Sequence, residues 1–240
     1  GIHPVEAALQ RHPEQLRLLI VAAESKNRRA RDLEQRASQL GIRIESRPRA
    51  TLDRDSDGQR HQDVMAEFVP ANLYGEKDLE VLLGKLADPA LVLVLDGVQD
   101  PHNLGACLRT ADAAGVGLVI LPKDGSAGLT PVARRSAAGA AEVMPILFAT
   151  NLARVLRRLK DSGVWLAGTA DGAEKDIYQA DLDGPLALVM GSEGKGMRRL
   201  TAELCDFLVN IPMQGSVNSL NVSVATGVCL FEINRQRAGK

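Results

Sequence analysis

The sequence is poor in aromatic residues and in cysteine. Phe, Trp and Tyr make up only 3% of the 240 residues. An RNA-binding sheet that stacks bases on surface Phe and Tyr side chains is therefore a poor fit. The cysteines form no CxxC pair and sit in apolar runs; they are Cys107, Cys205 and Cys229. This pattern disfavours a disulfide framework and a zinc ribbon, and it favours a reducing compartment, for which we predict the cytoplasm.

Long apolar runs are also missing. No run reaches the roughly 18 residues that a membrane-spanning helix needs, and the longest, such as Leu91–Leu95 and Leu186–Met190, have the length of a strand. We therefore expect no membrane partner, and no group of residues with ligand spacing suggests a metal. Lys and Arg number 29 against 30 Asp and Glu, which gives a net charge of −1. Any surface for nucleic acid must then be a local patch.

The first seventy residues are predicted to form a small α/β unit. The expected elements are a helix through Ala7–Leu9, strands at Leu16–Ala22, Ile42–Ser46 and Val64–Val69, and a helix at Asn27–Leu40. Between Ser25 and Arg49, eight basic residues accompany three acidic ones, which gives this segment a net charge of +5. The preference for Arg suits contact with phosphates. A solvated helix face with internal ion pairs explains the same pattern, so the charge alone leaves both interpretations open.

The rest of the chain alternates between short apolar strands and helices. It follows Pro70–Lys77, a polar, turn-rich segment that we interpret as a linker. The expected strands are Leu91–Leu95, Gly117–Leu121, Val143–Phe148, Trp165–Gly168, Leu186–Met190 and Leu208–Ile211. The expected helices are Asn103–Ala114, Pro131–Ser136, Asn151–Ser162 and Asn221–Arg237. This rhythm predicts an α/β fold with a mostly parallel sheet that is covered on both faces.

Three loops, each placed just after a predicted strand, contain the residues that could perform chemistry. Ligands of open α/β sheets gather at the carboxyl ends of the strands. The first loop leads into the helix that begins near Asn103, which we interpret as its N-cap. Arg109 lies on the far side of that helix from an apolar stripe made of Leu104, Cys107, Leu108 and Ala111. For a lone Arg, a solvated surface position is the commoner interpretation.

The second and third loops are rich in glycine and in small polar residues. Gly191, Gly194 and Gly196 allow tight turns and a close approach of the backbone to a ligand. The GxxxxGK[ST] spacing of a phosphate-binding loop is absent, so we exclude nucleotide triphosphatase chemistry. The third loop leads into the last helix, with Asn218 or Ser219 as the expected cap. Apolar residues follow at helical spacing and suit either a core or an interface; they are Leu220, Val224, Val228 and Phe231.

Together, the three segments resemble the motifs of the SpoU/TrmH family of RNA ribose 2′-O-methyltransferases, which belongs to the SPOUT class. The segments are Asp100–Arg109, Met190–Met197, and Ile211–Met213 with Ser219–Ala225. The opening residues Gly1–Leu9 and the basic front segment also resemble the subgroup that methylates a guanosine of bacterial 23S rRNA. The resemblance implies an RNA-binding domain similar to ribosomal protein L30e at residues 1–69, a linker at 70–77, and a trefoil-knotted methyltransferase domain at 78–240.

The same resemblance implies S-adenosylmethionine as the cofactor, held largely by main-chain groups of the knot. Matching the motifs places three residues in contact with it, namely Gly191, Ile211 and Leu220, and three more close to it, namely Thr169, Glu193 and Met213. It further implies a homodimer. The target would be a guanosine of 23S rRNA; a tRNA, a different rRNA nucleoside, or a non-catalytic role in ribosome assembly are the alternatives.

Five residues match the family's catalytic positions: Arg109, Asn103, Glu193, Ser219 and Asn221. A ribose hydroxyl is a poor nucleophile until its proton is withdrawn. Because a guanidinium keeps its proton up to a pH of about 12, we expect Arg109 to orient the target phosphate and to stabilise the developing alkoxide. A role as the base stays open. Asn103 would position Arg109 or the substrate, and Glu193 would hold Arg109 through a charge-assisted hydrogen bond or take up a proton. Ser219 and Asn221 would bind the ribose, cofactor or phosphate.

Overall fold

The computed structural model describes residues 1–11, 13–56, 58–68 and 73–239. By their internal contacts, the residues divide into two compact units. The smaller unit comprises Gly1–Ala71 and Ala138–Val143, and the larger one comprises Asn72–Ala137 and Met144–Lys240. The front unit is thus not one contiguous stretch, as the boundary at residue 69 assumes, because it includes six residues from the middle of the chain.

The smaller unit is a three-stranded sheet with helices, as far as the described residues show. Its elements are α1 (Ile2–Arg11), η1 (Pro13–Gln15), β1 (Leu16–Ala22), α2 (Arg28–Gln39), β2 (Arg43–Arg47), α3 (Arg49–Asp55), β3 (Val64–Phe68) and α7 (Ala140–Val143). Strand β1 lies in the centre, with β2 parallel and β3 antiparallel to it. Asn27 caps α2 by accepting a hydrogen bond from the Arg29 N–H, and the helix buries Ala30, Leu33 and Ala37. The expected strands and the helix expected at Asn27–Leu40 are confirmed here within two residues, except that Val69 lies outside the described residues. The helix expected through Ala7–Leu9 is longer, from Ile2 to Arg11, and α3 was not expected.

The larger unit contains, among its described residues, an eight-stranded sheet in the order β4-β7-β6-β5-β10-β8-β11-β9. Its strands are β4 (Leu73–Gly75), β5 (Leu91–Asp96), β6 (Leu118–Pro122), β7 (Ile146–Ala149), β8 (Trp165–Thr169), β9 (Lys175–Asp176), β10 (Leu186–Gly191) and β11 (Phe207–Asn210). Every neighbouring pair is parallel. The predicted α/β class with a mostly parallel sheet is confirmed.

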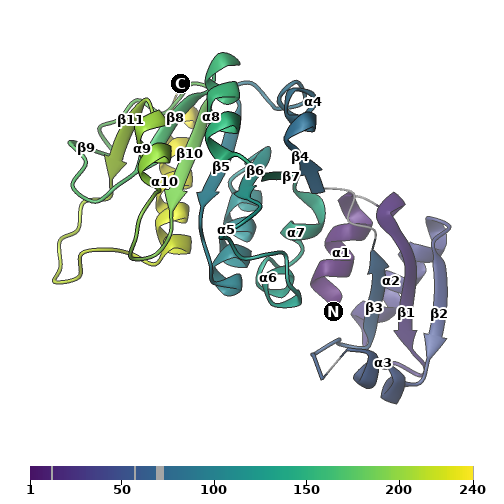
Figure 1. The fold of residues 1–240 in the computed structure, drawn as a ribbon. Helices are drawn as coiled ribbons and strands as arrows, with labels where there is room; N and C mark the ends of the chain where they lie inside the picture. The colour runs from purple at the N-terminus through teal and green to yellow at the C-terminus, as the bar shows by residue number, and fades with distance from the viewer. Residues whose placement is uncertain (12, 57, 69–72, 240) are drawn as a thin grey trace. The chain divides into compact units, whose positions relative to one another are not determined.

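Helices cover both faces of this sheet (Figure 1). They are η2 (Glu76–Asp78), α4 (Leu79–Leu83), α5 (Pro101–Ala113), α6 (Pro131–Ser136), α8 (Leu152–Asp161), α9 (Arg199–Leu204) and α10 (Val222–Ala238). On one face, α4 and α8 share a core with alternate residues of the strands, such as Val92 and Val94. The residues that alternate with them, Leu93 and Leu95, are also fully buried, and α10 packs on α5 and β10. A sheet buried on both faces explains the continuous apolar strands of the sequence.

Three sequence-based expectations need correction. The segment predicted as a linker, 70–77, lies partly outside the described residues, and from residue 73 onward it forms β4 and η2 of the larger unit. Its polar composition concealed an edge strand that pairs with β7. Asp100, not Asn103, is the N-cap of α5, since its side chain accepts a hydrogen bond from the His102 N–H. Likewise Asn221 caps α10 in place of Asn218 or Ser219.

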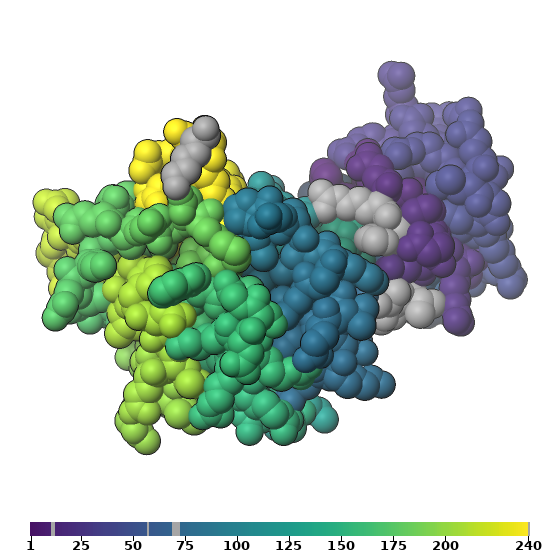
Figure 2. Space-filling model, turned by 90° about the horizontal axis from the view of Figure 1, so that it is seen from above, coloured from purple at the N-terminus to yellow at the C-terminus, as the bar shows by residue number. Residues whose placement is uncertain are grey.

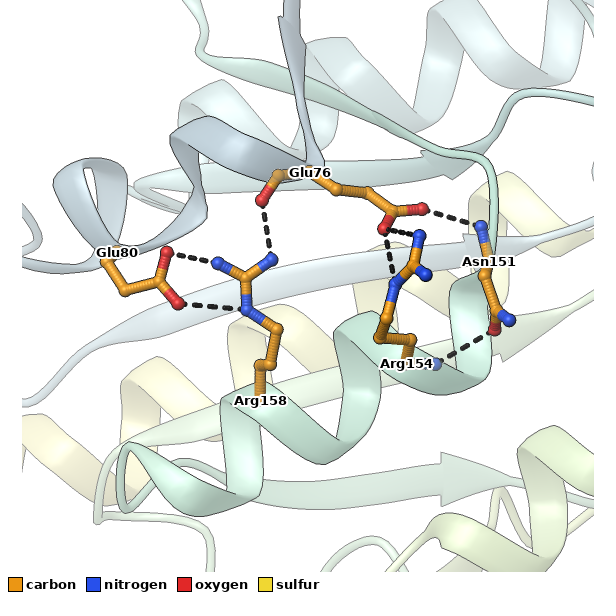
Figure 3. Close-up of polar contacts among 5 residues, drawn as sticks. All are labelled: Glu76, Glu80, Asn151, Arg154 and Arg158. Atoms are coloured by element: carbon orange, nitrogen blue, oxygen red, sulfur yellow. Dashed lines mark hydrogen bonds and ion pairs between the residues drawn. The ribbon is translucent and has the colours of Figure 1, made fainter.

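Charged side chains tie the segment of η2 and α4 to α8 (Figure 3). The Glu76 carboxylate accepts hydrogen bonds from the Asn151 N–H at 2.6 Å and from Arg154 Nε at 2.8 Å. Arg158 binds the Glu80 carboxylate and also donates to the Glu76 carbonyl oxygen at 2.6 Å. Burial raises the pKa of Glu76, but the hydrogen bonds from Asn151 and Arg154 outweigh it and leave that pKa below its ordinary value. This pairing holds the β4 edge of the sheet in place.

None of the helices in the described part of the chain combines the length and the apolar character required to cross a bilayer.

Candidate active site

A cavity of about 380 Å³ opens at the carboxyl ends of the central strands of the larger unit. Its walls come from the segments that follow β8, β10 and β11. Figure 1 shows the loop between β11 and α10 projecting beyond this end of the sheet. Among the predicted site residues, those that line the cavity are Thr169, Gly191, Glu193, Ile211, Met213, Ser219, Leu220 and Asn221. The structure thus brings together residues that are far apart in the sequence.

The loop after β10 folds back tightly because of its glycines. The N–H of Ser192 donates to the Gly196 carbonyl oxygen at 3.0 Å, and the N–H of Gly196 donates back at 2.9 Å. Gly194 and Gly196 have φ values of +75° and +66°, which residues with a side chain rarely adopt. At Gly191 the reason is space, because a Cβ would lie 2.2 Å from the Gly196 carbonyl carbon. Glycine at these positions lets the loop return over its own strand and form one wall of the cavity.

A polar cluster connects the first motif to the other two. Asn103, in the first turns of α5, donates a hydrogen bond from Nδ2 to the Glu193 carboxylate. Its Oδ1 accepts from Asn221 Nδ2 at 3.0 Å. Asn221 in turn accepts from the Ser223 N–H at 2.9 Å, which fixes the start of α10. Asn103 does not line the cavity itself. Its hydrogen bonds place it directly behind Glu193 and Asn221, which do line it.

Arg109 stands apart from this cluster. It follows Asn103 by six residues on α5, which corresponds to about 9 Å along the helix and to a different face. Its side chain is exposed, and it does not line the cavity. The apolar stripe predicted on the opposite side of α5 is buried throughout. A single chain therefore does not bring Arg109 into the cavity with the other predicted catalytic residues.

One face of α10 is apolar and uncovered. Val224 is 51% exposed and Phe231 is 53% exposed, while Leu220 and Val228 are partly buried. None of these four residues is fully buried in this chain, which does not favour the core interpretation offered by the sequence. Atoms of α10, yellow in Figure 2, reach the surface of the larger unit. α5 and α10 pack closely here, because a Cβ on Gly227 would lie 3.5 Å from the side chain of Thr110, the residue that follows Arg109.

Comparison with known proteins identifies the family. The sequence profile of the SpoU rRNA Methylase family matches residues 90–231. A second profile, described as RNA 2′-O ribose methyltransferase substrate binding, matches residues 1–74. The chain belongs to the SpoU rRNA methylase family. The resemblance of its three motifs is thereby confirmed.

Relatives within the SpoU family match the whole chain. The 23S rRNA (guanosine-2′-O-)-methyltransferase RlmB of Pseudomonas putida is 55% identical over 240 residues, which cover 100% of this chain and 96% of that protein. The protein of the same name from Pasteurella multocida is 56% identical over 238 residues, 99% of this chain and 97% of that one.

Solved structures share the fold. A crystal structure of an RNA 2′-O ribose methyltransferase has 29% identity and a TM-score of 0.77, covering 99% of this chain and 87% of that one. The SpoU methyltransferase AviRb from Streptomyces viridochromogenes, in complex with AdoMet, has 24% identity and a TM-score of 0.81, and the match covers 100% of this chain and 90% of that one.

The cavity of this SpoU family member fits S-adenosylmethionine in size and chemistry. About 380 Å³ lies within the usual range for small-molecule sites. The wall combines the apolar side chains of Met190, Ile211 and Leu220 with the hydroxyl of Ser219 and the amide of Asn218. An apolar wall with a few polar groups suits a flat base joined to a polar tail.

Sequence reasoning missed part of the lining. Ala170 and Asp171, in the loop after β8, line the cavity, and so does Asn210 at the end of β11. All three directly follow or end a strand at the same edge of the sheet. Their position at the carboxyl end of a predicted parallel strand was the signal that could have identified them.

Proposed function

We propose that the protein transfers a methyl group from S-adenosylmethionine to the ribose 2′-hydroxyl of a guanosine in 23S rRNA. The observation that supports this most is the meeting of the second and third motif loops at one cavity in a chain of the SpoU family. The first motif is joined to both loops by the hydrogen bonds of Asn103 with Glu193 and Asn221. The name of the relatives that match the whole chain supplies the target. Such an enzyme acts on RNA of the cell interior, so a cytoplasmic location follows.

The cofactor would be held mainly by the backbone around Gly191, Ile211 and Leu220, with Thr169 and Met213 beside it. When bound, S-adenosylmethionine supplies an electrophilic methyl group on a sulfonium. The Thr169 hydroxyl donates to the Val189 carbonyl oxygen at 3.3 Å and so stabilises the wall next to it. A trefoil knot around β10 and β11, as in the SpoU/TrmH enzymes, is part of this proposal. The strand order, with β10 inserted between β5 and β8, is compatible with such threading.

The polar cluster would prepare the acceptor. The Glu193 carboxylate, fixed by Asn103, lies at the cavity where it can accept the proton of a ribose hydroxyl or hold a cation. Ser219 and Asn221 line the same wall and offer hydrogen bonds to the ribose or phosphate. Arg109 would supply the positive charge that orients the phosphate and stabilises the developing alkoxide.

We propose that Arg109 acts in the cavity of a second copy of the chain. The single chain leaves Arg109 outside its own cavity, and it leaves Val224 and Phe231 exposed on α10, the helix that packs against the α5 helix of Arg109. Apolar faces of this kind mark interfaces more often than solvated surface. A homodimer formed through α10 would bury these residues and bring Arg109 to the boundary between the copies.

Mixing two inactive variants tests this arrangement. R109A lacks the cation, and S219A alters the cavity wall. If Arg109 acts across the dimer, unfolding and refolding the two variants together yields mixed dimers in which one site is intact, so activity returns. If Arg109 acts within its own chain, each site in the mixed dimer still lacks one residue, and no activity returns.

The smaller unit would bind the RNA in the manner of the L30e-like proteins that it resembles. Lys26, Arg28 and Arg31, around the start of α2, are exposed and form no ion pair with a described residue. Free cations of this kind are available to phosphates. We expect R28Q to weaken rRNA binding several-fold and to reduce its salt dependence, as the loss of a phosphate contact does. R43Q removes the same charge from a residue already paired with Glu45 and serves as the control.

The activity itself is tested with rRNA from cells that lack this protein. The purified protein should transfer a labelled methyl group from S-adenosylmethionine to that rRNA, and nuclease mapping should place it on a guanosine 2′-oxygen. R109A should still bind the cofactor but lose transfer. Acceptance of methyl by tRNA alone would move the target to the alternative, and rRNA binding without any methyl transfer would show a non-catalytic factor. Full activity of R109A would remove the proposed mechanism.

A further inference from the structure

Asp96 is a buried carboxylate at the end of β5, next to the cofactor cavity. The residue is 1% exposed, and in the sheet it pairs with Gly191, where the glycine loop begins. Burying a charge is costly unless a partner compensates it. None of the roles proposed above uses this residue, so its burial at this position needs another explanation.

The partner of Asp96 is Arg198, at the far end of the same loop. Asp96 Oδ2 accepts a hydrogen bond from the Arg198 N–H at 2.9 Å, and Oδ1 lies 3.5 Å from Arg198 Nε. Arg198 is the only cation of the described residues within ion-pair distance of this carboxylate. Its guanidinium also donates to the Asp124 carbonyl oxygen, in the loop after β6, at 3.3 Å. The pair therefore links segments that follow three neighbouring strands, β10, β5 and β6.

Both ends of the glycine loop are thus attached to one residue. The backbone of Asp96 pairs with Gly191 at the beginning of the loop, and its side chain binds the backbone N–H of Arg198 at the end. Between these points the loop provides Ser192, Glu193 and Gly196 to the cavity wall. Apart from this attachment, the glycine-containing loop is held by the Ser192–Gly196 bridge and by the hydrogen bond from Asn103 to Glu193.

We propose that Asp96 is a positioning residue that, through Arg198, holds the 191–198 loop in the conformation that binds the cofactor. The inference rests on the proposed function, because it takes the cavity as the S-adenosylmethionine site. It concerns binding of the cofactor, and it assigns Asp96 and Arg198 no contact with the reacting atoms. A rigid 191–198 loop preserves the affinity for the cofactor, since a displacement of about 1 Å in the residues of a binding site already weakens binding strongly.

The test compares D96N, R198M and the double variant with the wild type. D96N keeps the shape of the side chain but cannot form the ion pair. We expect each single variant to weaken the binding of S-adenosylmethionine and S-adenosylhomocysteine about tenfold in calorimetry. The double variant should bind both ligands as tightly as the single variants do, because each substitution removes the same ion pair between Asp96 and Arg198. The KM for the cofactor should rise while the KM for RNA stays unchanged. R199M, which alters a surface residue that is paired only with Glu203, is the matched control.

Hydrogen exchange gives a measurement that does not depend on activity. The amides of Ser192 and Gly196 donate across the loop, and they should exchange faster in D96N and R198M than in the wild type and R199M. Cofactor affinity within twofold of the wild type in both single variants would overturn the proposal, even if their melting temperatures fell. Additive losses in the double variant would overturn the coupling through Arg198. If D96N does not fold, R198M alone decides. A wild type that binds no cofactor would refute the proposed function instead, so the two failures are distinguishable.

Discussion

Replacing Gly191 with alanine tests how closely the glycine loop must return over its strand. The added Cβ would lie 2.2 Å from the Gly196 carbonyl carbon and 2.3 Å from the Met197 nitrogen. Ordinary contacts begin at 3.4 Å, so the backbone of the loop has to move by about 1 Å. Overpacking of this kind costs about 1–3 kcal/mol, and the two hydrogen bonds of the Ser192–Gly196 bridge add about 1 kcal/mol each if they break.

We therefore expect G191A to lower the free energy of unfolding by about 2–5 kcal/mol and to weaken S-adenosylhomocysteine binding at least tenfold. Urea unfolding and calorimetry measure the two effects. G215A is the matched control, because a Cβ there meets nothing within 4 Å. G194A separates strain from collision: its φ of +75° costs about 1–2 kcal/mol in an otherwise open space. If G191A matches the wild type in both measurements, the close return of the loop is not what shapes the cavity.

Three other outcomes are expected. E76Q should lower the free energy of unfolding by about 1–3 kcal/mol at pH 7. Because the hydrogen bonds from Asn151 and Arg154 lower the pKa of Glu76, their contribution to stability is present above the ordinary pKa of about 4.3 and is lost as the pH falls below it. A difference in unfolding free energy between E76Q and the wild type that stays constant from neutral to acid pH would contradict the assignment. Burial raises the pKa of the Cys107 thiol to about 11 and that of the Cys229 thiol to about 12. Both thiols should therefore resist alkylation in the native protein at about pH 8 and react after unfolding. Rapid alkylation of the native protein would argue against their burial. F231E should dissociate the proposed homodimer in light scattering and abolish transfer, a prediction that fails if the wild type is already a monomer.

The sequence predicted β5, β6 and β10 of the larger sheet well because these strands are buried on both faces. Continuous apolar runs such as Leu91–Leu95 can hardly form anything else at that length. It missed β9, Lys175–Asp176, because a two-residue strand at the sheet edge has no apolar pattern. It also missed α9, where Thr201 is the buried residue of a six-residue helix, too short for a periodic signal.

For the candidate site, the motif residues were identified by resemblance, and geometry added what no local pattern contains. The bond between Asp96 and Arg198 joins residues 102 positions apart. In the sequence, Asp96 simply ends an apolar strand, and Arg198 is one of several exposed cations. Arg109 shows the converse: its motif was plain in the sequence, yet the structure leaves its side chain outside the cavity of its own chain.

The membership of Ala138–Val143 in the smaller unit has a consequence for synthesis. Every residue of α7 is buried. This helix, the last element of the smaller unit in the sequence, packs on α1, which is the first. While the nascent polypeptide leaves the ribosome, α1 lacks this contact until α7 has emerged, after β5 and β6 of the other unit. The apolar cluster of the amino-terminal unit does not include α7, since its members all lie between Ile2 and Phe68. A polypeptide truncated near residue 71 would therefore keep that cluster and lose the cover that α7 gives to α1.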